Sequence, residues 1–133
     1  MEEPRKKDTC KKDTRKQKGA LAEEQATVYL VDQGYEIIDR NWRCRSGELD
    51  IVARKEDYLV FVEVRSRSGS TRYGTPAESV NTHKMIQVRK TAEVYLLYKQ
   101  IDLETTRLRF DVIAVLLNTD MPVSSLDHIV EAF

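Results

Sequence analysis

Acidic residues interrupt an otherwise apolar segment of the chain, Gly47 to Arg65, with the sequence GELDIVARKEDYLVFVEVR. The pattern is typical of a β-hairpin, in which successive side chains alternate between the two faces of each strand. Alternation divides the first arm into one face with Glu48, Asp50 and Val52 and another with Leu49, Ile51 and Ala53. It divides the second arm into one face with Phe61, Glu63 and Arg65 and another with Val60, Val62 and Val64.

The hydrophobic faces of the two arms coincide when the turn is centred on Glu56-Asp57, which makes paired residue numbers sum to 113. This register places Asp50 opposite Glu63 and Glu48 opposite Arg65. Opposed side chains of like charge destabilise a sheet, and two carboxylates about 5 Å apart repel by roughly 3 kcal/mol at an effective dielectric constant of about 20. A divalent cation between Asp50 and Glu63 would convert this repulsion into attraction.

Opposed carboxylates followed by a basic residue on the same strand suit metal-assisted phosphodiester hydrolysis. Their hard oxygen ligands favour Mg²⁺ or Mn²⁺, which polarises the phosphoryl oxygen and lowers the pKa of a bound water. A basic side chain at Arg65 would then orient the water or stabilise charge on the phosphorus. The spacing alone leaves open a second interpretation, in which surface acids are neutralised by Arg65 or Arg109.

The elements that must position these residues are predicted to form one domain, residues 19–133. Residues 1–18 carry no aliphatic or aromatic side chain after Met1, so we expect a disordered basic tail. Hydrophobic spacing then predicts a helix from Leu21 to Gln33 that ends at Gly34, followed by a strand over Tyr35–Trp42 and by the hairpin. After the hairpin we expect an exposed loop over Ser66–Pro76 and a second helix from Ser79 or Asn81 to Lys99, whose inward residues are Val88, Ala92, Tyr95 and Leu96. The chain should end with a buried strand over Arg109–Leu117 and an edge strand over Leu126–Phe133. This order is typical of an α/β protein with a mixed sheet.

Charge and composition narrow the function classes. The chain has 22 basic and 22 acidic residues, and its first 18 residues hold eight of the basic and four of the acidic ones, so the remainder carries a net charge of 14 − 18 = −4. That balance argues against a protein that grips nucleic acid by bulk charge. The sequence has no apolar run typical of a membrane span or a secretory signal, so we expect a cytoplasmic protein without membrane contact. Cys10 and Cys44 are expected to be free thiols.

A series of ordered blocks runs through residues 19–133: GALAEEQA, GYEIIDRNWR, GELDIVA, LVFVEVRSR, YGTPAESV followed by Lys84, RFDVIAV and HIVEAF. In these blocks the chain resembles the YraN family of small bacterial proteins. That family is assigned to the PD-(D/E)XK, or restriction-endonuclease-like, superfamily and is similar in pattern to archaeal Holliday-junction resolvases. The resemblance implies a restriction-endonuclease-like three-layer core, with a mixed β-sheet flanked by helices. It also implies a metal-dependent endonuclease that uses Mg²⁺ or Mn²⁺ and acts on DNA rather than RNA, including branched DNA, and it implies a homodimer.

The resemblance also assigns site residues. Asp50, Glu63 and Glu23 fall on the metal-binding pattern, and Arg65 stands where the superfamily usually has a lysine. Arginine stays protonated and cannot act as a general base, so Lys84 is a second candidate for the basic catalytic residue. Contacts to nucleic acid are expected from Arg43, Arg45, Arg67, Arg72 and Tyr73.

Several assignments stay open on the sequence. Glu48 either binds the metal or pairs with Arg65, and Asp111 is expected to support the fold as the partner of an arginine. His83 and His128 are not assigned to a metal. The alternative to a nuclease is a catalytically impaired module on the same fold that binds nucleic acid or another protein.

Overall fold

The computed structural model describes residues 10–68, 82–117 and 125–133, and within them it leaves the side chains of residues 10–16, 18, 67 and 68 undescribed. The described elements are α1 (Cys10–Asp32), β1 (Glu36–Cys44), β2 (Gly47–Lys55), β3 (Tyr58–Ser68), α2 (Thr82–Tyr98), β4 (Arg107–Leu117) and β5 (Ser125–Ile129). Their order along the chain is the predicted one. Ser79, Asn81 and most of the predicted loop over Ser66–Pro76 lie outside the described residues.

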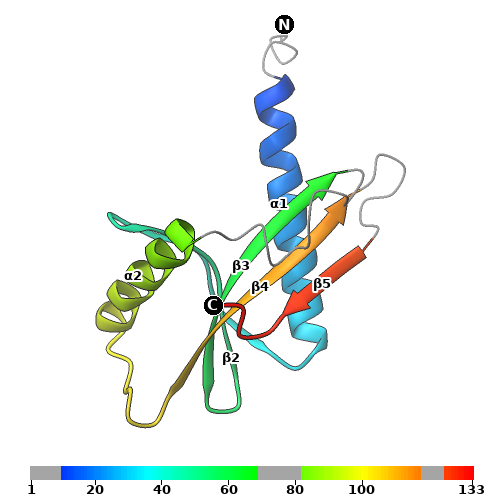
Figure 1. Cartoon of the computed structure of the whole chain (residues 1–133). Helices are drawn as coiled ribbons and strands as arrows, with labels where there is room; N and C mark the ends of the chain where they lie inside the picture. The colour runs from blue at the N-terminus through cyan, green and yellow to red at the C-terminus, as the bar shows by residue number, and fades with distance from the viewer. Residues whose placement is uncertain (1–9, 69–81, 118–124) are drawn as a thin grey trace, which may run out of the picture.

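The five strands form one mixed sheet in the order β1-β2-β3-β4-β5. The β3–β4 pair is parallel and the other three pairs are antiparallel. Figure 1 shows α1 and α2 on different sides of this sheet, with β5 at the edge. The predicted α/β class, a mixed sheet flanked by helices, is therefore confirmed, and the arrangement is consistent with a restriction-endonuclease-like core.

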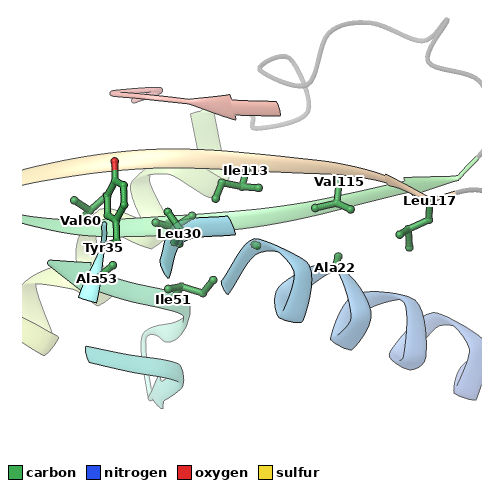
Figure 2. Packing of buried hydrophobic residues seen from close by; sticks show 11 residues of the cluster. Ala22, Leu30, Tyr35, Ile51, Ala53, Val60, Ile113, Val115 and Leu117 are labelled. Atoms are coloured by element: carbon green, nitrogen blue, oxygen red, sulfur yellow. The ribbon is translucent and has the colours of Figure 1, made fainter. Parts of the chain in front are cut away.

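Two hydrophobic cores hold the three layers together. The core under α1 contains Leu30, Ile113 and, from β3, Val60 (Figure 2). Val62 of β3 belongs to the same core. The core under α2 contains Phe61 from the same strand and Tyr95 from the helix. The alternation predicted for the second arm of the hairpin is therefore confirmed, and Glu63 continues the face that carries Phe61.

Helix α1 is longer than the hydrophobic pattern predicts, since it begins at Cys10 rather than near Gly19. Residues 11–18 include four lysines, one arginine and one glutamine, which favour helix, and extending a packed helix needs no new nucleus. The helix ends as predicted, because Gly34 has φ 95°. The Gly34 N–H donates to Val31 O and the Tyr35 N–H donates to Leu30 O, which is a Schellman cap.

The C-terminal strand is shorter than expected. It ends at Ile129 rather than Phe133, because Glu131 adopts φ 53° and the chain turns back. The Glu131 N–H donates to Asp111 Oδ1 at 3.1 Å, and the Ala132 N–H donates to Phe110 O. Helix α2 buries the predicted inward residues Val88, Ala92, Tyr95 and Leu96, together with Thr91.

Candidate metal centre

The hairpin of β2 and β3 has the predicted register. Its pairs run from Lys55 opposite Tyr58 to Ile51 opposite Val62, and each pair sums to 113. The main-chain ladder stops there, one residue before Asp50, so it does not include the predicted pairs of Asp50 with Glu63 and of Glu48 with Arg65. The Asp50 carboxylate instead accepts the main-chain N–H of Val64 at 2.9 Å through Oδ2. Asp50 is thus the residue at which β2 separates from β3.

Strand β1 explains this separation. Arg40 pairs with Ile51 and Trp42 with Leu49, which places Asn41 beside Asp50. Asn41 has φ 53°, a left-handed conformation that asparagine tolerates better than most residues. The alternation of β2 breaks at this point.

Because of the break, Ile51 packs in the core under α1 while Leu49 packs in the core under α2. The prediction that Leu49 and Ile51 share a face is therefore wrong.

The tip of the β1–β2 hairpin is held against α2. The Gln87 side-chain amide donates to Ser46 O at 3.4 Å. Gly47 leaves no room for a side chain, since a Cβ there would lie 3.0 Å from Thr91 Oγ1 and 3.3 Å from Gln87 Nε2. These contacts fix the start of β2, and with it the positions of Glu48 and Asp50.

Three carboxylates converge where β2 separates from β3 while it remains paired with β1. One oxygen each of Glu23, Glu48 and Asp50 lies within 4.8 Å of the others, so α1 contributes one acid and β2 contributes two. Glu23 and Asp50 were predicted for this position, whereas Glu63 is not a member of the group. Glu48 takes that place, and its ion pair is with Arg43 at 3.7 Å rather than with the expected Arg65.

Glu63 lies beside this acidic group on β3 and is only 5% exposed. Its Oε2 is 3.4 Å from Lys84 Nζ and 3.9 Å from an Arg65 guanidinium nitrogen. Lys84 and Arg65, both predicted for the site, therefore lie next to Glu63. Among the described residues, Arg65 Nε is buried without a hydrogen-bond partner. A buried donor without an acceptor lowers the free energy of unfolding by about 1–3 kcal/mol.

The acidic group is under electrostatic strain. Burial, and after it the charges of Glu63, Glu23 and Glu48, together raise the pKa of Asp50 to about 7 against the opposing Val64 hydrogen bond. Burial also raises the pKa of Glu23, although a hydrogen bond from Asn41 and the charge of Arg40 oppose it. A bound cation would relieve both effects.

The donor set suits a hard divalent cation. All three groups offer carboxylate oxygens, and oxygens bound to one ion at about 2.0–2.6 Å lie no more than about 5 Å apart. The group can therefore hold a metal ion with little movement of its side chains. Asn41, which the sequence analysis missed, orients Glu23 by its hydrogen bond.

The residues predicted to contact nucleic acid are only partly described. Arg43 and Arg45 are exposed near the tip of the β1–β2 hairpin, where Arg43 pairs with Glu48 across the two strands. The Arg67 side chain, Arg72 and Tyr73 lie outside the described residues.

Within the described part of the chain, no helix combines the length and apolar character that a membrane span needs.

A second polar cluster lies under α1 and has a structural role. Asp111 is fully buried, and its carboxylate accepts hydrogen bonds from Arg109 and the Glu131 main chain and pairs with His128 Nε2 at 2.7 Å. Burial alone would raise the pKa of Asp111, but the bonds from His128 and Arg109 outweigh it and lower the pKa. The supporting role predicted for Asp111 fits this geometry. His83 is exposed at the start of α2.

Comparisons with known proteins agree on one family. The model of the uncharacterised protein family UPF0102 matches residues 22–115. A UPF0102 protein of Clostridium kluyveri is 44% identical over 115 residues, which is 86% of this chain and 92% of the relative. A UPF0102 protein of Rhodococcus opacus is 44% identical over 115 residues, which is 86% of this chain and 94% of the relative. A UPF0102 protein of Moorella thermoacetica is 42% identical over 120 residues, which is 90% of this chain and 98% of the relative. The chain therefore belongs to the UPF0102 family, which is the YraN family that its motifs predict.

Proposed function

We propose that this protein is a Mg²⁺- or Mn²⁺-dependent endonuclease that hydrolyses phosphodiester bonds in DNA, including branched DNA. The observation that supports it most is the convergence of Glu23, Glu48 and Asp50 where β2 separates from β3, with Glu63 beside them. The predicted membership of the PD-(D/E)XK superfamily is part of this proposal. A divalent cation, when bound, supplies the Lewis acid chemistry by polarising the phosphoryl oxygen and making water more acidic.

The residues of the chain have separate roles in this proposal. Glu23, Glu48 and Asp50 hold the cation, with Glu63 as a further ligand once its cationic partners turn to the substrate. The Val64 N–H fixes one oxygen of Asp50, which leaves the other for the cation. Exposed Arg43 and Arg45 contact phosphates along the strand.

Lys84 and Arg65 hold the scissile phosphate. Arg65 remains protonated, so it can donate hydrogen bonds but cannot take a proton from water. Its buried Nε is suited to donate to a phosphate oxygen. Lys84, 3.4 Å from Glu63, is the residue of this pair that can exchange a proton. Lys84→Met should therefore abolish cleavage while metal binding remains.

A cleavage assay tests the proposal. Labelled four-way junctions, flaps and single strands are incubated with the protein in Mn²⁺, Mg²⁺ or EDTA. We expect metal-dependent cleavage of at least one substrate, and loss of cleavage in Asp50→Asn. Glu24→Gln is the matched control, because it removes an exposed carboxylate next to Glu23 that pairs with Arg40. Failure of all substrates at millimolar metal would overturn the proposal.

A second candidate function rests on Arg65. An arginine at the position of the catalytic lysine suits a module that binds nucleic acid without cutting it. That module would show DNA affinity that falls with salt and survives Asp50→Asn, because phosphate contacts release counterions whether or not the acids bind metal. Binding without cleavage would favour this candidate, and the absence of any DNA affinity would exclude both.

A further inference from the structure

The face of α2 that points away from the sheet carries an ordered pattern. Ile86 is 51% exposed and Leu97 is 80% exposed, and between them lie exposed Lys90 and Glu93. We call these four residues the outer seam. Their spacing of four, three and four residues confines them to an arc of about 60° on a helix with 3.6 residues per turn. Val88, Ala92 and Tyr95 are buried on the opposite side.

The outer seam has the pattern of a helix-packing surface rather than of a solvated face. Its two apolar residues, Ile86 and Leu97, lie at the ends and its two charged residues, Lys90 and Glu93, lie between them. Side chains at intervals of three and four residues form ridges that allow two helices to pack along their length. Val94 and Tyr98, which are 37% and 71% exposed, extend the apolar surface along one flank. Figure 1 shows α2 outermost on its side of the sheet, and none of the other described helices and strands covers its outer face. At the C-terminal end of the helix, Val94, Leu97 and Tyr98 form contiguous exposed apolar surface, which marks an interaction site.

The charges of the seam identify its partner. When two copies of α2 lie antiparallel with facing residue numbers summing to 183, Ile86 meets Leu97 and Lys90 meets Glu93. The two-fold axis repeats both contacts, so each residue of the outer seam in one copy faces its complementary residue in the other copy. A surface that is complementary to itself in this way is the requirement for an isologous dimer.

We propose that the outer seam of α2 docks a second copy of this chain as an antiparallel helix pair. The contact is independent of the acidic group and of its metal. One helix pair buries less surface than a standard interface, so the dimer should dissociate in the range of about 10 µM. Reversing one charge of the seam should weaken it at least about tenfold.

Sedimentation equilibrium of the full chain between about 1 and 200 µM tests this proposal across the expected range. The wild type should pass from monomer to dimer. Lys90→Glu and Glu93→Lys should each dimerise at least about tenfold more weakly than the wild type, because like charges then face each other. An equimolar mixture of the two variants should dimerise, because both facing pairs become opposite in charge again. The mixture also shows that the variants are folded.

Two exposed apolar residues provide a matched control. Ile86→Lys should abolish the dimer, while Val31→Lys, at a 54% exposed position on α1, should leave it intact. A wild type that stays monomeric throughout, or a dimer that survives Ile86→Lys, would overturn the proposal. Weakened single variants whose mixture associates no more tightly than either variant alone would overturn the antiparallel pairing.

Discussion

Replacing Asp50 by asparagine should stabilise the metal-free protein at alkaline pH. In the folded chain the pKa of Asp50 rises from its ordinary value of 3.8 to about 7, chiefly through burial and then through the charge of Glu63. Folded molecules therefore keep the proton that unfolded chains release, and wild-type stability falls as the pH rises from about 4 to about 7. About three pH units at roughly 1.4 kcal/mol each amount to about 4 kcal/mol above pH 7.

Asparagine removes this cost without removing the local hydrogen bond. Its side-chain oxygen can still accept the Val64 N–H that Asp50 Oδ2 accepts at 2.9 Å. In EDTA, Asp50→Asn should be more stable than the wild type by up to about 4 kcal/mol at pH 8.5. At pH 5 the difference should fall to roughly 1–2 kcal/mol, because folded wild type is then protonated while its unfolded chain is ionised.

Urea unfolding of both proteins at pH 5 and pH 8.5, with EDTA present, measures the difference directly. Glu24→Gln should show no comparable dependence of its stability difference on pH. An Asp50→Asn variant that is equal to or less stable than the wild type at pH 8.5 would refute the reasoning. So would a stability difference that does not change with pH.

Three further predictions concern the surrounding structure. Gly47→Ala should cost about 1–2 kcal/mol and weaken Mn²⁺ binding, because its Cβ would lie 3.0 Å from Thr91 Oγ1 and 3.3 Å from Gln87 Nε2. Urea unfolding should show a smaller loss in a Gln87→Ala background, which removes the second of these contacts. Asp111→Asn should cost about 3–5 kcal/mol, because it leaves the buried Arg109 without its anionic partner. The folded-state pKa of Asp111 is lowered, so its ionised carboxylate stabilises the wild type above pH 3.8, and this stability is lost as the pH falls through the folded-state pKa. In an acid titration, Asp111→Asn should therefore lose less stability than the wild type.

The sequence predicted those features that depend on local rules. Matching hydrophobic faces gave the register of β2 and β3, and Gly34 marked the end of α1, because strand alternation and left-handed caps are readable from residue types. The order of the elements followed from hydrophobic periodicity in the same way.

What the sequence did not predict depends on a local distortion and on tertiary contacts. A left-handed Asn41 beside Asp50 breaks the alternation of β2, so Leu49 and Glu48 do not lie where period two places them. The asparagine itself was the only available signal, since asparagine tolerates this conformation better than most residues. The pairing of Glu63 with Lys84 depends on the position of α2, which no spacing within the hairpin encodes.

The most direct test of the central claim is a Mn²⁺ titration of the wild type and Asp50→Asn in parallel, read as thermal unfolding. A cation that binds only the folded state adds about 2.7 kcal/mol at 100 times its dissociation constant, so the wild-type melting temperature should rise with Mn²⁺. Asp50→Asn should start from a higher melting temperature at pH 8.5 and show no rise. A wild type that does not respond to millimolar Mn²⁺, or a variant that responds equally, would contradict a metal site formed by Glu23, Glu48 and Asp50.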